Sequence, residues 1–293
     1  MIAFLATVAL AARPDVTVIV SGDIGPYLDP VPAFTDAVGV PVQTINIHGR
    51  WVEAEVEILA LKAAEPEVVF ALGAKAAWTV RNLMPNTPMI YAAVLDPERY
   101  GLPGNQVTGI HATVAPVTYL SQVSAYFPTV TDIGVIRGTG ITAEDEEALN
   151  AAAKEVGLRL TIEKVDSPRT FRRAFNSLAE SQDAVWVSPE RGVLTPEAFR
   201  TAVEEMRRRR KPLLADTENM VTAGAAFAVT PSPEGIGRQA AELAKRVLDG
   251  GAPAIMPVED PLELSTAINI RTLEAGEIAF EALMVDFANV VIE

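Results

Sequence analysis

A chain of 293 residues, 49% of them apolar, is long enough for one large or two ordinary globular domains. Its 38 acidic and 24 basic residues give a formal net charge of -14, which argues against nucleic-acid binding, because that function needs a basic surface to neutralise phosphates. The absence of cysteine excludes disulfides, thiolate catalysis and zinc–thiolate sites, and two histidines, His48 and His111, are too few for a multi-histidine metal site. We therefore expect no metal and no other cofactor.

The first twelve residues form a short apolar run that ends in Ala9-Leu10-Ala11, a pattern similar to a signal-peptide cleavage site. The run is too short to span a bilayer and lacks the basic residues that open a secretory signal. We interpret it as a truncated or short signal, with an extra buried strand or a disordered stub as alternatives. Polar residues interrupt every other apolar run, so no other segment is long enough to span a membrane.

In the first half of the chain, short β-branched strands alternate with amphipathic helices. Strands are predicted over residues 16–20, 42–47, 68–72, 89–94 and 107–111, and helices over residues 32–38, 51–64 and 74–83.

The second half repeats this order. Helices are predicted over residues 117–126, 143–156, 170–180, 196–209, 218–223 and 233–249, and strands over residues 132–136, 159–165, 184–188, 212–215, 225–229 and 263–269. Such alternation predicts parallel sheets with helices on both faces, and its repetition predicts two doubly wound lobes. No Gly/Pro/Ser-rich linker separates the halves, so residues 113–116 are expected to cross directly between them.

Ligands of open parallel sheets bind outside the carboxyl ends of the strands, beside helix N-termini. In the first half, the candidate residues at these positions are Ser21, Asp23, Tyr27, Gly73, Ala74, Lys75, Ala76 and Asp96. The segment Gly73-Ala74-Lys75-Ala76 opens a helix with small residues, so a ligand anion could approach free backbone N–H groups with Lys75 as counter-charge. Structural alternatives stay open: Ser21 and Asp23 could be helix or turn caps, Gly73 a tight strand-to-helix turn, and Asp96 a turn former.

In the second half, the candidate residues are Thr139, Glu190, Asp216 and Thr217. Asp216 follows a strongly apolar strand and has no basic residue nearby after Lys211, which favours a ligand contact over a surface role. Gly138-Thr139-Gly140 lacks the third glycine of a dinucleotide fingerprint and follows the wrong strand, so it is weak evidence for a nucleotide. The three tryptophans are interpreted as core or helix-face residues, with stacking on a ligand as the alternative: Trp51, Trp78 and Trp186.

Catalytic signatures are missing from the sequence: it has no Walker lysine motif, G-x-S-x-G elbow or H-E-x-x-H motif. Both histidines are interpreted as satisfied loop or hinge residues. An enzyme on this scaffold would have to draw its acid–base pair from these histidines or from four carboxylates, namely Asp23, Asp96, Glu190 and Asp216.

The same loops resemble those of a known family. The matching stretches are residues 68–77, 88–97, 107–110, 212–221, 223–225 and 235–244. In their order and spacing they are similar to the ABC-transporter substrate-binding proteins that include tryptophan- and other amino-acid-type binding proteins. The resemblance implies a type I periplasmic-binding fold, that is, an α/β protein of two doubly wound Rossmann-like lobes with a hinge.

The family also implies lobe boundaries and ligand roles. An N-terminal lobe is expected over residues 14–114 plus 232–258, and a C-terminal lobe over 115–231 plus 259–293. A ligand carboxylate would lie at Gly73 to Ala76 and a ligand ammonium at Asp216. The chain departs from the family where Ala74 replaces the frequent Ser or Thr and where Lys75 adds a charge, so the identity of the ligand stays open.

We therefore expect a solute-binding component of an ABC-type importer that closes on a small, carboxylated or zwitterionic, amino-acid-like molecule without covalent chemistry. Its partners would be this ligand and ABC permease subunits in the inner membrane. The protein is expected to be a monomer, exported and free in the periplasm, because no lipid-modified cysteine is available. A ligand-sensing domain of a signalling system and an enzyme on the same scaffold are the alternatives.

Overall fold

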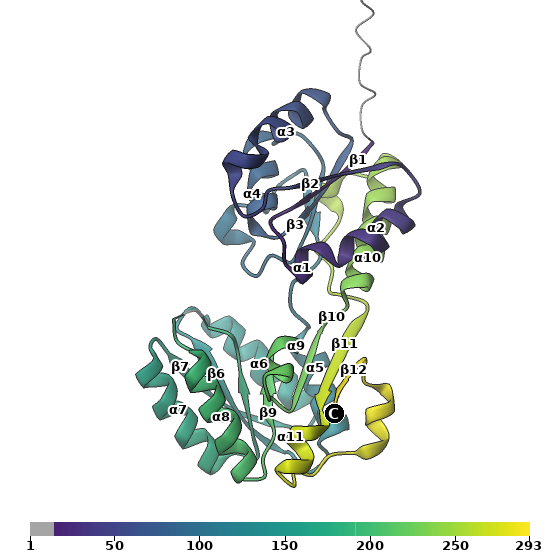
Figure 1. Cartoon of the computed structure of the whole chain (residues 1–293). Helices are drawn as coiled ribbons and strands as arrows, with labels where there is room; N and C mark the ends of the chain where they lie inside the picture. The colour runs from purple at the N-terminus through teal and green to yellow at the C-terminus, as the bar shows by residue number, and fades with distance from the viewer. Residues whose placement is uncertain (1–14, 191) are drawn as a thin grey trace, which may run out of the picture. The chain divides into compact units, whose positions relative to one another are not determined.

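A computed structural model describes residues 15–190 and 192–293; the apolar run interpreted as a signal and the side chain of Trp51 lie outside the described part. The chain forms two compact units, one containing the residues up to Thr113 with Pro231–Glu263 and the other Val114–Thr230 with Leu264–Glu293. The chain passes between the units three times. In Figure 1, the first unit runs from purple to blue and is completed by light-green α10 (Pro233–Leu248).

The first unit is built on a five-stranded sheet in the order β2-β1-β3-β4-β5, with parallel pairing throughout. Its strands are β1 (Val16–Val20), β2 (Val42–Asn46), β3 (Val68–Leu72), β4 (Met89–Ala92) and β5 (Val107–Gly109). Its other helices are α1 (Gly25–Leu28), α2 (Pro30–Val38), α3 (Trp51–Ala64) and α4 (Ala74–Leu83), with 3-10 turns η1 (Glu98–Tyr100) and η2 (Pro253–Ile255).

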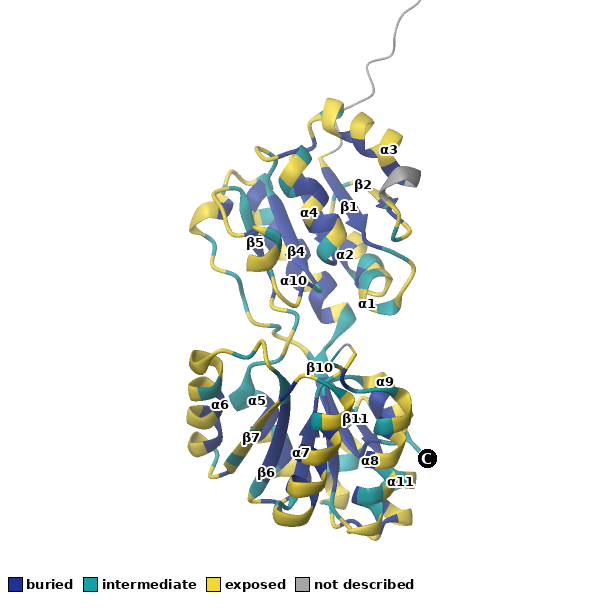
Figure 2. Ribbon diagram, turned by 90° about the vertical axis from the view of Figure 1, so that its left-hand side faces the viewer, coloured by how far each residue is buried: buried dark blue, intermediate teal, exposed yellow. Residues whose placement is uncertain are grey.

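Helices cover both faces of this sheet, which explains the continuous apolar runs of β1 and β3. Successive side chains of β1 alternate between the faces: Val18 packs with α2 and α10, whereas Ile19 packs with α3 and α4. Gly237 permits the close packing of α10 on α2, because a Cβ atom there would lie 2.2 Å from the carbonyl oxygen of Pro30. Figure 2 shows buried strands in dark blue under helices with yellow outer faces.

The second unit holds a seven-stranded sheet in the order β12-β11-β10-β9-β8-β6-β7. Its strands are β6 (Asp132–Gly138), β7 (Arg159–Val165), β8 (Ala184–Val187), β9 (Leu213–Ala215), β10 (Phe227–Pro231), β11 (Leu264–Asn269) and β12 (Val290–Ile292). Its helices are α5 (Pro116–Tyr126), α6 (Ala143–Glu155), α7 (Pro168–Ser181), α8 (Pro196–Arg208), α9 (Glu218–Thr222), α11 (Ile270–Ala275) and the 3-10 segment η3 (Ala282–Phe287).

Two cores again form, one on each face of the sheet. Val135 and Trp186 pack with α5 and α6, and the next residues along their strands, Ile136 and Val187, pack with α7 and α8. The predicted alternation of strands and helices is therefore found in both units, as two α/β sheets with helices on their faces.

Several details differ from the predictions. Strand β6 continues through Arg137 and Gly138, which were expected in a loop, because both residues pair with β7 opposite Lys164 and Val165. The sequence also did not predict α1, the 3-10 turns, α11 or β12.

A short segment after α10 lies in a different unit from the one expected. Residues 259–263 belong to the first unit, whereas the family resemblance placed them in the second. The Glu259 amide donates to the Gly109 carbonyl oxygen and its own carbonyl accepts from the His111 amide, both at 2.9 Å. These bonds attach the segment to the end of β5.

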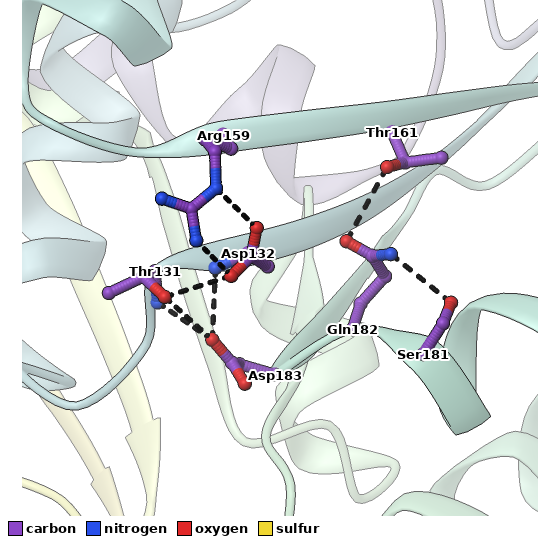
Figure 3. Close-up of polar contacts among 7 residues, drawn as sticks. All are labelled: Thr131, Asp132, Arg159, Thr161, Ser181, Gln182 and Asp183. Atoms are coloured by element: carbon purple, nitrogen blue, oxygen red, sulfur yellow. Dashed lines mark hydrogen bonds and ion pairs between the residues drawn. The ribbon is translucent and has the colours of Figure 1, made fainter.

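A polar network ties together the amino-terminal ends of β6, β7 and β8 (Figure 3). The Asp183 carboxylate accepts from the backbone amides of Thr131 and Asp132, each at 3.0 Å. Arg159 donates from Nε to Oδ1 of Asp132 at 2.7 Å. The network lies at the opposite edge of the sheet from the loops expected to bind ligand, so we interpret it as structural.

No helix among the described residues is both long and apolar enough to cross a membrane.

Candidate functional site

Both sheets have the same kind of switch point, where neighbouring strands connect to helices on opposite faces. It lies between β1 and β3 in the first unit and between β6 and β8 in the second. Ligands of doubly wound sheets bind at the carboxyl edge of such points. Each unit therefore presents one half-site, called here the N-unit half-site and the C-unit half-site.

In the N-unit half-site, the loops after β1 and β3 are fastened together. Ser21 Oγ accepts a hydrogen bond from the Ala76 amide in the first turn of α4 at 2.9 Å. Gly73 has φ +89°, and a Cβ atom there would lie 2.6 Å from both Ser21 Oγ and Tyr27 Cε1. A glycine is therefore required where Ser21 and the half-buried Tyr27 approach the start of α4.

The amino end of α4 retains two free donors. The amides of Ala74 and Lys75 make no hydrogen bond to the described part of the protein, and the Gly73 N-cap offers no side-chain acceptor. Free amides and the helix dipole favour an anion at this position. The exposed Lys75 side chain bends to the Gly49 carbonyl oxygen, at 2.5 Å from Nζ.

An open hollow of about 380 Å³ lies beside this helix end. It is lined by Ile47, Gly49, Ala74, Lys75, Trp78, Thr79 and Tyr100. The surface of the hollow is mainly apolar. Trp78 is 48% exposed, so it lies on the outer face of α4 and not in the core.

Asp23 and Asp96 have local partners. Asp23 accepts from Asn46 Nδ2 at 2.7 Å and lies 2.9 Å from His48 Nδ1. The hydrogen bond to His48 is the main cause that holds the pKa of Asp23 below its ordinary value. Asp96 is exposed and accepts from the Arg99 amide at 3.2 Å, which is the geometry of a turn former.

In the C-unit half-site, Asp216 is the centre of a polar cluster. Its Oδ1 atom accepts from Trp186 Nε1 at 2.5 Å, and its Oδ2 atom accepts from the Ser188 hydroxyl. Arg137 Nη2 lies 3.9 Å from Oδ1. The Asp216 side chain is 30% exposed, so it is partly open to solvent although three neighbours surround it.

Two residues of this cluster also contact aromatic rings, Trp186 that of Tyr119 and Arg137 that of Trp186. The rings of Tyr119 and Trp186 lie 4.1 Å apart and 4° from parallel, and the Arg137 guanidinium carbon lies over the Trp186 ring, 4.2 Å from its centroid. Tyr119 donates its hydroxyl to the Ala215 carbonyl oxygen at 2.9 Å. Burial, together with the charge of Asp216, raises the pKa of Tyr119 well above its usual value, so the phenol stays neutral.

The remaining candidates of this unit have different environments. Glu190 is half-buried and its Oε1 atom accepts from the Gly138 amide at 2.9 Å, which joins the loops after β6 and β8. Thr217 caps α9 through the Met220 amide. Thr139 is exposed at the turn after β6.

Part of this cluster could not be predicted from the sequence. The sequence shows no basic residue near Asp216 after Lys211, whereas the fold brings Arg137 to it. Trp186 is a buried core residue, as predicted, but its indole N–H also donates to Asp216, which was not predicted. Both come from strands that are remote in the sequence, so spacing alone gave no signal. Among the described residues, no group of three or more His, Cys, Asp or Glu side chains could hold a metal ion.

Comparisons with solved structures support the fold. The ligand-free, open structure of a substrate-binding protein with adhesive properties from Clostridium difficile matches with a TM-score of 0.78 at 17% identity, covering 95% of this chain and 98% of that one. The ABC domain from Streptococcus pneumonia in complex with L-Trp matches with a TM-score of 0.65 at 20% identity, covering 96% of this chain and all of that one (100%). At these identities the likeness concerns the fold, which is the two-lobed α/β fold of type I periplasmic binding proteins.

Sequence comparison extends to the family. A curated relative, the tyrosine-binding protein of Clostridioides difficile (strain R20291), is 26% identical over 219 residues. The match covers 71% of this chain and 62% of the relative, so it spans less than two thirds of the relative's length. The family model described as ABC transporter substrate binding protein matches residues 42–291. The resemblance inferred from the loop sequences is thus confirmed: the chain belongs to the ABC transporter substrate-binding protein family.

Proposed function

We propose that this protein is the solute-binding component of an ABC-type importer and that its ligand is a small, amino-acid-like molecule. Asp216 carries this proposal. It is a partly exposed carboxylate directly after β9, at the carboxyl edge next to the switch point between β6 and β8, and it is held in place by Trp186 and Ser188. An ammonium group supplies donors and the opposite charge for the carboxylate lone pairs that these two residues do not use.

The ligand carboxylate is assigned to the first turn of α4. The free amides of Ala74 and Lys75 and the positive end of the helix dipole suit an anion there. Gly73, Ser21 and Ala76 keep this turn in place. In this proposal the other candidate residues line the ligand site around these two groups: Asp23, Tyr27, Asp96, Thr139, Glu190 and Thr217.

The relatives favour the same class of ligand. The curated relative is named as a tyrosine-binding protein, and one of the similar solved structures holds L-Trp. Both ligands carry an α-carboxylate and an α-ammonium, the two groups that the half-sites are suited to bind. We infer that the ligand of this protein shares that head group.

Family membership implies a permease partner in a membrane, and proteins of this family are typically periplasmic or extracellular. We extend this to an exported, periplasmic protein that acts as a monomer and binds its ligand without covalent chemistry. Membership in a family of substrate-binding proteins favours binding rather than catalysis.

A thermal-shift screen with L-amino acids, small carboxylic acids and nucleosides tests this proposal. A ligand that binds only the folded state at about 100 times its Kd adds roughly 2.7 kcal/mol to the free energy of unfolding. At least one L-amino acid should therefore raise the Tm by several degrees. A response to nucleosides alone, or turnover of the ligand that binds, would contradict the proposal.

A further inference from the structure

Arg137 carries a positive charge at the carboxyl edge of the second sheet, and most of its donors are unused. Its side chain is only 15% exposed. Within the described part of the chain, its guanidinium makes one hydrogen bond, from Nη1 to the Ile136 carbonyl oxygen at 3.1 Å. The closest carboxylate oxygen, on Asp216, is 3.9 Å away and thus beyond hydrogen-bond distance. A guanidinium has five N–H donors, so several remain for another group.

The guanidinium is also held in a fixed position. Its central carbon lies 4.2 Å from the centroid of the Trp186 ring, and the Tyr119 ring stacks on that ring at 4.1 Å. The hydroxyl of Tyr119 is in turn bonded to the backbone at the end of β9. A cation held in this way loses little side-chain freedom when it binds an anion, which is a property of receptor residues.

The acidic neighbours of Arg137 are engaged elsewhere. Both oxygens of Asp216 accept hydrogen bonds, one from Trp186 and one from Ser188. Glu190 accepts from the Gly138 amide at 2.9 Å, and in the described structure it forms no ion pair with Arg137. In the C-unit half-site, Arg137 and Asp216 therefore form an ion pair at 3.9 Å without a direct hydrogen bond, and the guanidinium keeps N–H donors for a further group.

We propose that Arg137 is a specificity-determining residue that binds a second anionic group of the ligand, so that the preferred ligands are dicarboxylic L-amino acids. This inference rests on the proposed function, in which α4 takes the α-carboxylate and Asp216 the α-ammonium. Arg137 is then a mostly buried cation of the C-unit half-site to which neither head group of the ligand is assigned. A carboxylate in the ligand side chain matches it, because guanidinium and carboxylate groups form paired hydrogen bonds.

The test compares L-glutamate with L-glutamine, which has the same shape but no side-chain charge. Isothermal titration calorimetry on the wild-type protein should give a Kd for L-glutamate at least about tenfold lower than for L-glutamine. In Arg137→Gln this preference should disappear while the L-glutamine affinity changes by less than about threefold. Arg200→Gln, which removes an exposed arginine of α8 in the same unit, should keep the wild-type preference.

Equal or tighter binding of L-glutamine by the wild-type protein overturns the inference, and this comparison does not depend on any variant folding. An equal loss of both ligands in a folded Arg137→Gln protein also overturns it, because Arg137 would then serve the head group or only support Trp186. If L-tyrosine binds and L-glutamate does not, this inference fails and the proposed function stands. If no L-amino acid binds, the proposed function fails as well.

Discussion

Gly73 lies at a position where the backbone and the neighbours both require a glycine. Its φ is +89°, and the space a Cβ atom would take is filled by Ser21 and Tyr27. Its own amide donates to the Ala92 carbonyl oxygen, so the backbone cannot turn without losing a bond between β3 and β4. The glycine thus sets how the N-unit half-site presents the first turn of α4.

Gly73→Ala should therefore destabilise the protein by roughly 2–4 kcal/mol, since the strained backbone conformation and the steric overlap add. Thermal denaturation followed by circular dichroism should show a fall in Tm of several degrees. Gly140→Ala is the matched control, because a Cβ atom there meets nothing within 4 Å. An equal Tm for the two variants would show that the approach of Ser21 and Tyr27 does not constrain Gly73.

Asp216 could be predicted as a site residue from the sequence, but its neighbours could not. Asp216 could be singled out because an acid after an apolar parallel strand lies at the edge where ligands bind. Its hydrogen-bond donor Trp186 lies 30 residues away in the sequence, and its cationic neighbour Arg137 is farther still. Only the pairing of β6, β8 and β9 brings them together, so no local pattern could predict the cluster.

At the scale of the elements, the amino-terminal ends of β6, β7 and β8 depend on charged side chains. The hydrogen bond from Arg159 is the largest cause that lowers the pKa of Asp132. Burial alone would raise the pKa of Asp183, but the amides of Thr131 and Asp132 outweigh it and the net shift is downward. Both carboxylates therefore bind protons less readily in the folded protein than in the unfolded chain.

Carboxylates of this kind stabilise the fold fully above their unfolded pKa, near 3.8, and the stabilisation is lost as the pH falls through their lower folded values. Urea denaturation between pH 6 and about pH 2.5 should show this loss below about pH 4. Asp183→Asn should lower stability at neutral pH and reduce its fall at acid pH. Asp286→Asn, an exposed aspartate of the same unit, should behave as wild type; an equal acid response of Asp183→Asn and wild type would contradict the account.

Elements with strong periodicity could be predicted, and short ones could not. The bounds of β1, β3, α3 and α4 agree with the prediction. Strands β1 and β3 are continuous apolar runs followed by turn residues, and α4 has one apolar face, whereas α3 is rich in apolar residues all round. Helix α7 begins earlier than predicted, because Ser167 caps it and Pro168 occupies its first turn. Helix α11 and strand β12 have six and three residues, too few for a periodic signal.

For the whole molecule, the composition excluded several classes of protein but identified neither the family nor the ligand. The net charge of -14 and the lack of cysteine removed several classes of protein, and the repeated strand–helix order predicted two α/β lobes. The family followed from the order of several loops, and the match of its model to residues 42–291 confirms it. The ligand could not be predicted because the same fold accepts many molecules, and recognition depends on a few side chains at the two half-sites.

The most direct test of the central claim is isothermal titration calorimetry with the L-amino acid that gives the largest thermal shift. The wild-type protein should bind it with 1:1 stoichiometry and should not bind the same acid without its amino group. Asp216→Asn should raise the Kd by about 30-fold or more, because the ammonium loses its charged partner. The control Glu218→Gln, at the exposed start of α9, should leave the Kd unchanged. Equal binding of the deaminated acid, or an unchanged Kd in Asp216→Asn, would contradict the assignment of Asp216 as the ammonium receptor.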